Sequence, residues 1–188
     1  HDTIVDLLLE KQDIDVDSGK HCGRTLLSWA ASNDSFYWVA ELLLDRGADL
    51  ELQDDSGRTP LSLSSTERLR GVLVEGGAYL ESRDNNGRTP LSWAAAEGWT
   101  LKVNLLLENG ANPESRSRDG RSILSHAAED CQRQEIEILL RWGADILSTD
   151  NDGRTPLSWA ESYISPNPRN TWDYKITVGL LRAKEGKL

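Results

Sequence analysis

The segment Gly-Arg-Thr-Pro-Leu-Ser at residues 87–92 decides the fold, because the chain repeats it. The same six letters begin again at Gly57 and Gly153, and related segments begin at Gly23 and Gly120. Successive copies are 34, 30, 33 and 33 residues apart. A nearly constant period of this length is typical of proteins that stack one supersecondary unit several times. The sequence therefore predicts a row of similar units.

Each unit is expected to hold two helices followed by a finger-like turn. Thr89 offers a hydroxyl that can cap a helix, and Pro90 has its φ already fixed near the helical value. The short helix that starts here should stop near Gly98, where a left-handed turn is accessible. A second apolar run around Val103 has the i, i+3, i+4 spacing of one buried helical face. Asp, Asn and Gly in residues 148–153 favour a tight turn into the next unit.

Composition and charge limit the classes of function. The chain has 188 residues, of which 38% are hydrophobic and 28% charged, so it has enough apolar surface for one folded domain. A net charge of −10 argues against nucleic acid or an anionic membrane as the main partner. Apolar stretches such as residues 105–107 are far shorter than the roughly 18 residues of a membrane-spanning helix. Two cysteines favour a reducing compartment, which predicts a cytoplasmic location with the nucleus as the alternative.

The period, the Thr-Pro-Leu start, the Ala pair and the Gly-Ala-Asp endings at residues 47–49 and 143–145 resemble the ankyrin repeat. The resemblance implies an all-α solenoid of stacked helix-turn-helix units with hairpin-like fingers, forming a single domain over residues 1–188. The serine and tryptophan variant of the motif is similar to ankyrin arrays of large multidomain fungal proteins. The expected division is a partial repeat 1–22, repeats 23–56, 57–86, 87–119 and 120–152, and an atypical capping repeat 153–188.

The array departs from its own pattern at three places. Residues 1–22 hold only the later, apolar part of a unit, so we expect the chain to begin inside a repeat. The unit 57–86 is three residues short, which predicts either a truncated first helix or a bend. In the last unit two prolines predict a loop over residues 164–172 before a helix around 176–181, and this loop either caps the array or docks a partner.

Serine replaces the histidine that ankyrin repeats usually carry after Thr-Pro-Leu. A shorter hydroxyl hydrogen bond is expected to take over the histidine's role of tying neighbouring turns. The affected positions are Ser28, Ser62, Ser92, Ser125 and Ser158.

The residues around each finger glycine and at the ends of the first helices are those that ankyrin arrays use for recognition. Arginine recurs directly after every finger glycine, and two interpretations stay open. The arginines either offer bidentate donors to carboxylates of a partner, or pair with aspartates of their own or the neighbouring finger. The predicted partner-binding residues are His21, Arg24, Asp55, Arg58, Asn85, Arg88, Arg118, Arg121, Asn151, Arg154, Glu97 and Asp130.

Three tryptophans share one position in the first helix. Trp29, Trp93 and Trp159 occupy it in alternate units, with Leu63 and His126 between them. The alternation of large and smaller side chains favours packing between neighbouring units. An aromatic recognition stripe is the alternative interpretation.

Catalytic chemistry finds little support in this sequence. The three histidines show no Ser-His-Asp or Cys-His arrangement, and His126 and Cys131 lack a second pair of metal ligands. We therefore expect no catalytic residue, no metal, no cofactor and no small-molecule substrate. The sequence predicts a non-catalytic scaffold that binds a protein partner through the concave surface of fingers and first helices. The alternative is an intramolecular regulatory or assembly module that contacts other domains of a longer parent chain.

Overall fold

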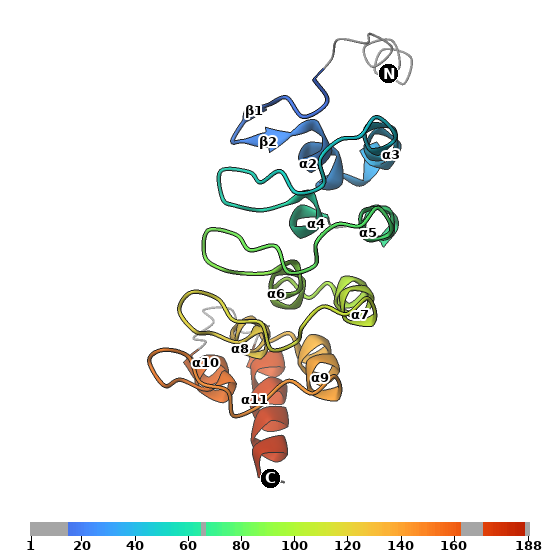
Figure 1. Cartoon of the computed structure of the whole chain (residues 1–188). Helices are drawn as coiled ribbons and strands as arrows, with labels where there is room; N and C mark the ends of the chain where they lie inside the picture. The colour runs from blue at the N-terminus through green and yellow to red at the C-terminus, as the bar shows by residue number, and fades with distance from the viewer. Residues whose placement is uncertain (1–14, 65–66, 163–170, 187–188) are drawn as a thin grey trace. The chain divides into compact units, whose positions relative to one another are not determined.

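The computed structural model describes residues 15–64, 67–162 and 171–186, and its regular elements there are mostly helices (Figure 1). The chain divides into two compact units, His1–Tyr79 and Leu80–Leu188. Residues 1–14 of the expected partial repeat and residues 164–170 of the expected proline-containing loop lie outside the described residues. The prediction of a single domain stays a prediction.

The first unit begins with a small finger and continues with helix pairs. In the finger, β1 pairs with β2 in antiparallel fashion, and α2 then packs against α3 and α4, while α3 packs against α5. The elements are β1 (Gly19–His21), β2 (Arg24–Thr25), α2 (Leu26–Ala31), η1 (Asp34–Phe36), α3 (Tyr37–Asp45), α4 (Pro60–Leu63) and α5 (Glu67–Glu75).

The second unit repeats the same pairing of a short first helix with a longer second helix. Here α6 packs against α7 and α8, α8 packs against α9 and α10, and α11 contacts both α10 and α9 (Figure 1). The elements are α6 (Pro90–Ala96), α7 (Thr100–Glu108), α8 (Ile123–Glu129), α9 (Arg133–Arg141), α10 (Pro156–Ser162) and α11 (Thr171–Glu185).

The first helices start where the sequence predicts. The Thr89 hydroxyl accepts the backbone N–H of Ser92 at 3.3 Å, and the Ser92 hydroxyl accepts the backbone N–H of Thr89 at 3.3 Å, which is a capping box. The expected hydroxyl hydrogen bond is present, and this serine makes it to the cap of its own helix. The same bond to the capping residue recurs at Ser28, Ser62, Ser125 and Ser158.

The core is built from the apolar faces of the helix pairs. In the second unit Leu106 and Ile136 from the second helices are fully buried, as are Leu91 and Leu124 from the first helices. The i, i+3, i+4 spacing in the sequence therefore identifies the buried faces correctly.

An acidic side chain links consecutive repeats at the base of each finger. In the first unit Glu51 accepts the backbone N–H of Tyr79 at 2.7 Å. In the second unit Glu81 accepts the backbone N–H of Asn112, and Glu114 accepts that of Asp145, both at 2.8 Å. Leu147 stands at the next equivalent position, where its side chain is 52% exposed and cannot accept a hydrogen bond.

A second link runs beside the first in the second unit and ends at the same repeat. The Arg83 guanidinium donates to the Arg116 carbonyl oxygen at 2.5 Å, and the Arg116 guanidinium donates to the Thr149 carbonyl oxygen at 2.6 Å. Thr149 has no guanidinium to continue the series. Both links therefore stop before the last repeat.

Two irregular units depart from the pattern as follows. The first helix α4 of the short unit has only four residues, which agrees with the predicted truncation. Helix α11 begins at Thr171, five residues earlier than expected, so Thr171 and Trp172 are helical rather than part of a loop. Pro166 and Pro168 forbid regular helix only at their own positions and just before them, and no proline follows Asn170.

Candidate protein-binding surface

Each finger is a tight turn closed by the same backbone bonds. In the finger of residues 54–58, Asp54 donates its N–H to the Arg58 carbonyl oxygen at 3.0 Å, and Gly57 donates to the Asp54 carbonyl oxygen at 2.7 Å. The same two bonds recur in the fingers of residues 84–88, 117–121 and 150–154. Gly57 has φ +80°, in the left-handed region that favours glycine, and this explains why the finger glycine recurs.

A buried carboxylate holds the finger from inside. Oδ1 of Asp54 accepts the backbone N–H groups of Ser56 and Arg58 at 2.9 and 3.0 Å. Burial alone would raise the pKa of Asp54, but these N–H groups and the Arg58 guanidinium outweigh it and hold the pKa below its usual value. Asp84 and Asp150 accept the equivalent N–H groups in their own fingers. The finger backbone is therefore fixed before any partner arrives.

The shared tryptophan position ties the finger to the first helix. Trp93 Nε1 donates to Asp84 Oδ2 at 3.0 Å, and Trp159 Nε1 donates to Asp150 Oδ2 at 2.9 Å. In each pair the two residues are nine positions apart. Neither packing nor recognition alone describes these tryptophans, because they anchor the fingers. The sequence contains this signal as a pairing of Asp and Trp at a fixed spacing, and we did not identify it from the sequence.

Two further units hold the finger with other side chains. His126 Nε2 lies 3.0 Å from the Ser117 hydroxyl, again nine positions away. Leu63 has no N–H group to donate to the finger aspartate. The Arg58 guanidinium donates to Asp54 Oδ2 instead, from Nε at 3.1 Å and from Nη2 at 3.0 Å.

His126 is a buried structural residue with 1% of its surface exposed. Burial, together with the positive charge of Arg121, lowers its pKa to about 3. The imidazole is therefore neutral at pH 7 and hydrogen-bonded to its own finger.

Three of the five finger arginines pair with finger aspartates, as the second interpretation predicts. Arg58 pairs with Asp54 of its own finger at 3.0 Å, and Arg24 lies 3.7 Å from the same carboxylate in the next finger. Arg154 pairs with Asp152 at 2.6 Å. These pairs make the arginines part of the scaffold rather than uncommitted donors.

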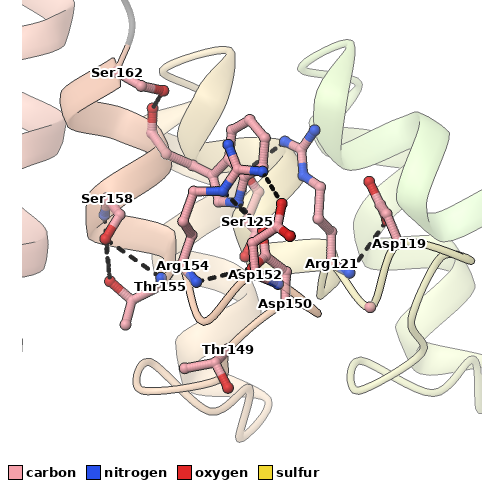
Figure 2. A network of polar contacts seen from close by, with 12 residues as sticks. Asp119, Arg121, Ser125, Thr149, Asp150, Asp152, Arg154, Thr155, Ser158 and Ser162 are labelled. Atoms are coloured by element: carbon pink, nitrogen blue, oxygen red, sulfur yellow. Dashed lines mark hydrogen bonds and ion pairs between the residues drawn. The ribbon is translucent and has the colours of Figure 1, made fainter.

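The other arginines also stack on the tryptophans that anchor the fingers. The Arg88 guanidinium lies 5.0 Å from the centre of the Trp93 ring. Arg121 and Arg154 lie 3.6 and 4.1 Å from the centre of the Trp159 ring, and Figure 2 shows both side chains converging. The Arg121 side chain also pairs with Glu129 and is only 7% exposed, so it offers a partner little surface. The prediction that Arg121 is accessible to a partner is therefore wrong.

The other predicted residues mostly lie at the surface. Arg118 is exposed, although its backbone N–H donates to the Asn86 carbonyl oxygen of the neighbouring finger at 2.9 Å. Burial and the nearby charges of Glu129 and Glu97 raise the pKa of Asp130. Arg24 is half-buried, and the backbone of His21 belongs to β1. The exposed predicted residues are Asp55, Asn85, Arg118, Asn151, Glu97, Asp130 and Arg154.

A cleft of about 990 Å³ opens between the first two fingers of the first unit. Its apolar wall includes Leu26 and Trp29, which are 43% and 47% exposed. Its polar wall includes Asp55 and Arg58.

Two kinds of feature are absent from the residues that the structure describes. Among them, no three or more His, Cys, Asp or Glu side chains gather in a group able to hold a metal ion. No described helix is long and apolar enough to cross a membrane.

The family comparison agrees with the repeats seen in the structure. The model described as ankyrin repeats (3 copies) matches residues 1–72 and 66–150. The chain belongs to the ankyrin-repeat family, and the predicted all-α ankyrin fold is confirmed. Ankyrin repeats generally mediate protein–protein interactions and are typically non-catalytic. Comparison with curated proteins gives no match.

Proposed function

We propose that this chain is a non-catalytic module that binds a protein partner on its fingers and on the ends of its first helices. The hydrogen bonds that hold the finger backbone in place carry this proposal. Exposed side chains such as Asp55 and Asn85 stand on a backbone that Asp54 and Asp84 already hold in place. A preformed surface loses little conformational entropy on binding, so a standard interface of roughly 800 Å² per partner is sufficient.

The proposed surface combines polar fingertips with acidic helix ends. Asp55, Asn85 and Asn151 present short polar side chains, while Glu97 and Asp130 present carboxylates where α6 and α8 end. This composition suits a partner with polar and basic groups. Arg121 is left out because it is buried against its own repeat.

The last repeat is proposed to cap the array. Leu147 and Thr149 replace the glutamate and arginine that link earlier repeats, so these two links do not join the last repeat to its neighbour. We also propose a cytoplasmic or nuclear location, because the chain has only two cysteines, Cys22 and Cys131, too few for a disulfide framework.

Capture from a lysate of the source organism, followed by mass spectrometry, tests the proposed surface. The variant Asp55→Lys with Arg118→Glu reverses two exposed fingertip charges and leaves the net charge unchanged. The control Glu108→Lys with Arg141→Glu makes the same reversals at the exposed ends of α7 and α9. All three proteins are first checked for folding by circular dichroism.

We expect the wild type and the control to capture the same protein, and the fingertip variant to capture at least about tenfold less of it. Equal capture by all three proteins would move the binding surface away from the fingers. Failure of the wild type to capture any protein would contradict binding in trans and favour the intramolecular module.

A further inference from the structure

The three equivalent tryptophans differ in what surrounds their rings. The Trp159 ring has the guanidinium groups of Arg121 and Arg154 within 3.6 and 4.1 Å of its centre. The Trp93 ring has that of Arg88 at 5.0 Å. In both repeats the indole N–H also donates to the finger aspartate. At this position the chain therefore builds the same contact twice, between an indole ring and a guanidinium group.

Trp29 lacks both of these contacts. Nine positions before it stands Lys20 rather than an aspartate. The Arg24 guanidinium points to the Asp54 carboxylate at 3.7 Å, and no described cation stacks on the Trp29 ring. Phe36 supports the indole with a centre-to-centre distance of 4.5 Å, yet the Trp29 side chain remains 47% exposed. The ring is held in position, and among the residues that the structure describes no cation stacks on it as on its equivalents.

The exposed part of Trp29 lies in a cleft that can accept a side chain. The cleft has a volume of about 990 Å³, and Leu26 contributes a second apolar surface beside the ring. The charges of Arg24 and Arg58 are balanced by those of Asp54 and Asp55 in the same lining, so an incoming cation meets no excess of positive charge.

The charge of the surrounding unit also favours a cation. Residues 15–79 contain six lysines and arginines and eleven aspartates and glutamates, a net charge of −5. Charge of one sign around a cleft raises the local concentration of the opposite charge and its rate of association.

We propose that the Trp29 ring binds an arginine side chain of the protein partner, which completes in trans the contact that the chain makes for itself at Trp93 and Trp159. This inference rests on the proposed function and names the chemistry of the partner. A planar guanidinium stacks on an indole better than the compact, strongly hydrated ammonium of lysine does. The lining of the same cleft also includes the acidic residue Asp55.

Two peptides that differ by one charge test the inference without knowledge of the partner. The probes are acetyl-Gly-Gly-Arg-Gly-Gly-amide and the same peptide with neutral, nearly isosteric citrulline in place of arginine. Both are titrated into the ¹⁵N-labelled full chain while the indole N–H signals are followed by NMR. The variant Trp29→Leu assigns the Trp29 signal by its disappearance.

The arginine peptide is expected to shift the Trp29 signal saturably, with an affinity about 5- to 30-fold higher than that of the citrulline peptide. The signals of Trp93 and Trp159 should stay in place, because their rings already carry guanidinium groups. Trp142 is the matched control, since its side chain is 45% exposed but lies at the end of α9. Equal shifts with both peptides, or equal shifts of Trp29 and Trp142, would overturn the inference.

The result separates this inference from the proposed function. If the arginine peptide does not select Trp29 while the fingertip variant still loses the captured protein, only the arginine site is refuted. If Trp29 selects arginine but no protein is captured from lysate, the arginine site stands as a chemical property and the proposed partner binding fails.

Discussion

Lowering the pH from 7 to 5 should destabilise this protein through His126. The imidazole is 1% exposed, and burial together with the charge of Arg121 lowers its pKa from 6.5 to about 3. Because the folded state resists protonation, the unfolded state binds more protons between these two values. Stability is therefore complete above pH 6.5 and falls as the pH decreases toward 3.

The size of the effect follows from the two pKa values. With 6.5 for the unfolded chain and about 3 for the folded chain, the free energy of unfolding should fall by about 2 kcal/mol between pH 7 and pH 5. Asp54, Asp119 and Asp150 have pKa values below 3.8, so their contributions are lost only at lower pH. The interval from pH 7 to 5 thus isolates the histidine from these carboxylates.

Urea unfolding followed by circular dichroism at both pH values measures the loss. The control is His126→Leu, because Leu63 occupies the equivalent position of another repeat and is 8% exposed there. The control should unfold at nearly the same urea concentration at pH 7 and pH 5. An equal loss of stability in wild type and control, or no loss in the wild type, would refute the claim that His126 is buried as a neutral imidazole.

Five further substitutions test the scaffold by urea unfolding. Asp150→Ala should cost about 2–4 kcal/mol, because two backbone N–H groups and one indole N–H lose their acceptor. Glu114→Ala should cost about 1 kcal/mol by breaking a link between repeats, whereas Leu147→Glu should change stability by less than about 0.5 kcal/mol. Gly87→Ala should cost more than about 2 kcal/mol, since φ is +77° and a Cβ would lie 2.9 Å from a backbone nitrogen. Gly110→Ala should cost only about 1 kcal/mol, because no atom lies within 4 Å of the Cβ that the alanine would add.

The sequence predicts the repeat unit well because its signals are local. The cap at Thr89, the fixed φ of Pro90 and the apolar spacing around Leu106 act within one or two turns of helix. Each of these features can be interpreted without knowing what lies beside the helix. The sequence alone therefore predicts where the first helices start and which of their faces are buried.

The roles of the site residues depend on contacts that the sequence does not display. Arg121 follows the finger glycine like the other arginines, yet only the structure places it against Trp159 and Glu129. Arg24 differs from Arg58 in reaching a carboxylate of the following finger rather than of its own. Only the pairing of Asp84 with Trp93 and its counterparts had a sequence signal, namely the shared spacing of nine residues. Distinguishing scaffold arginines from partner-binding residues therefore required the structure.

Hydrogen exchange of the chain, with and without its captured partner, tests the central claim most directly. Binding on the fingers predicts slower exchange in residues 54–58, 84–88, 117–121 and 150–154 when the partner is present, with little change in the second helices α3, α7 and α9. Slower exchange confined to those second helices, with unchanged fingers, would contradict the account.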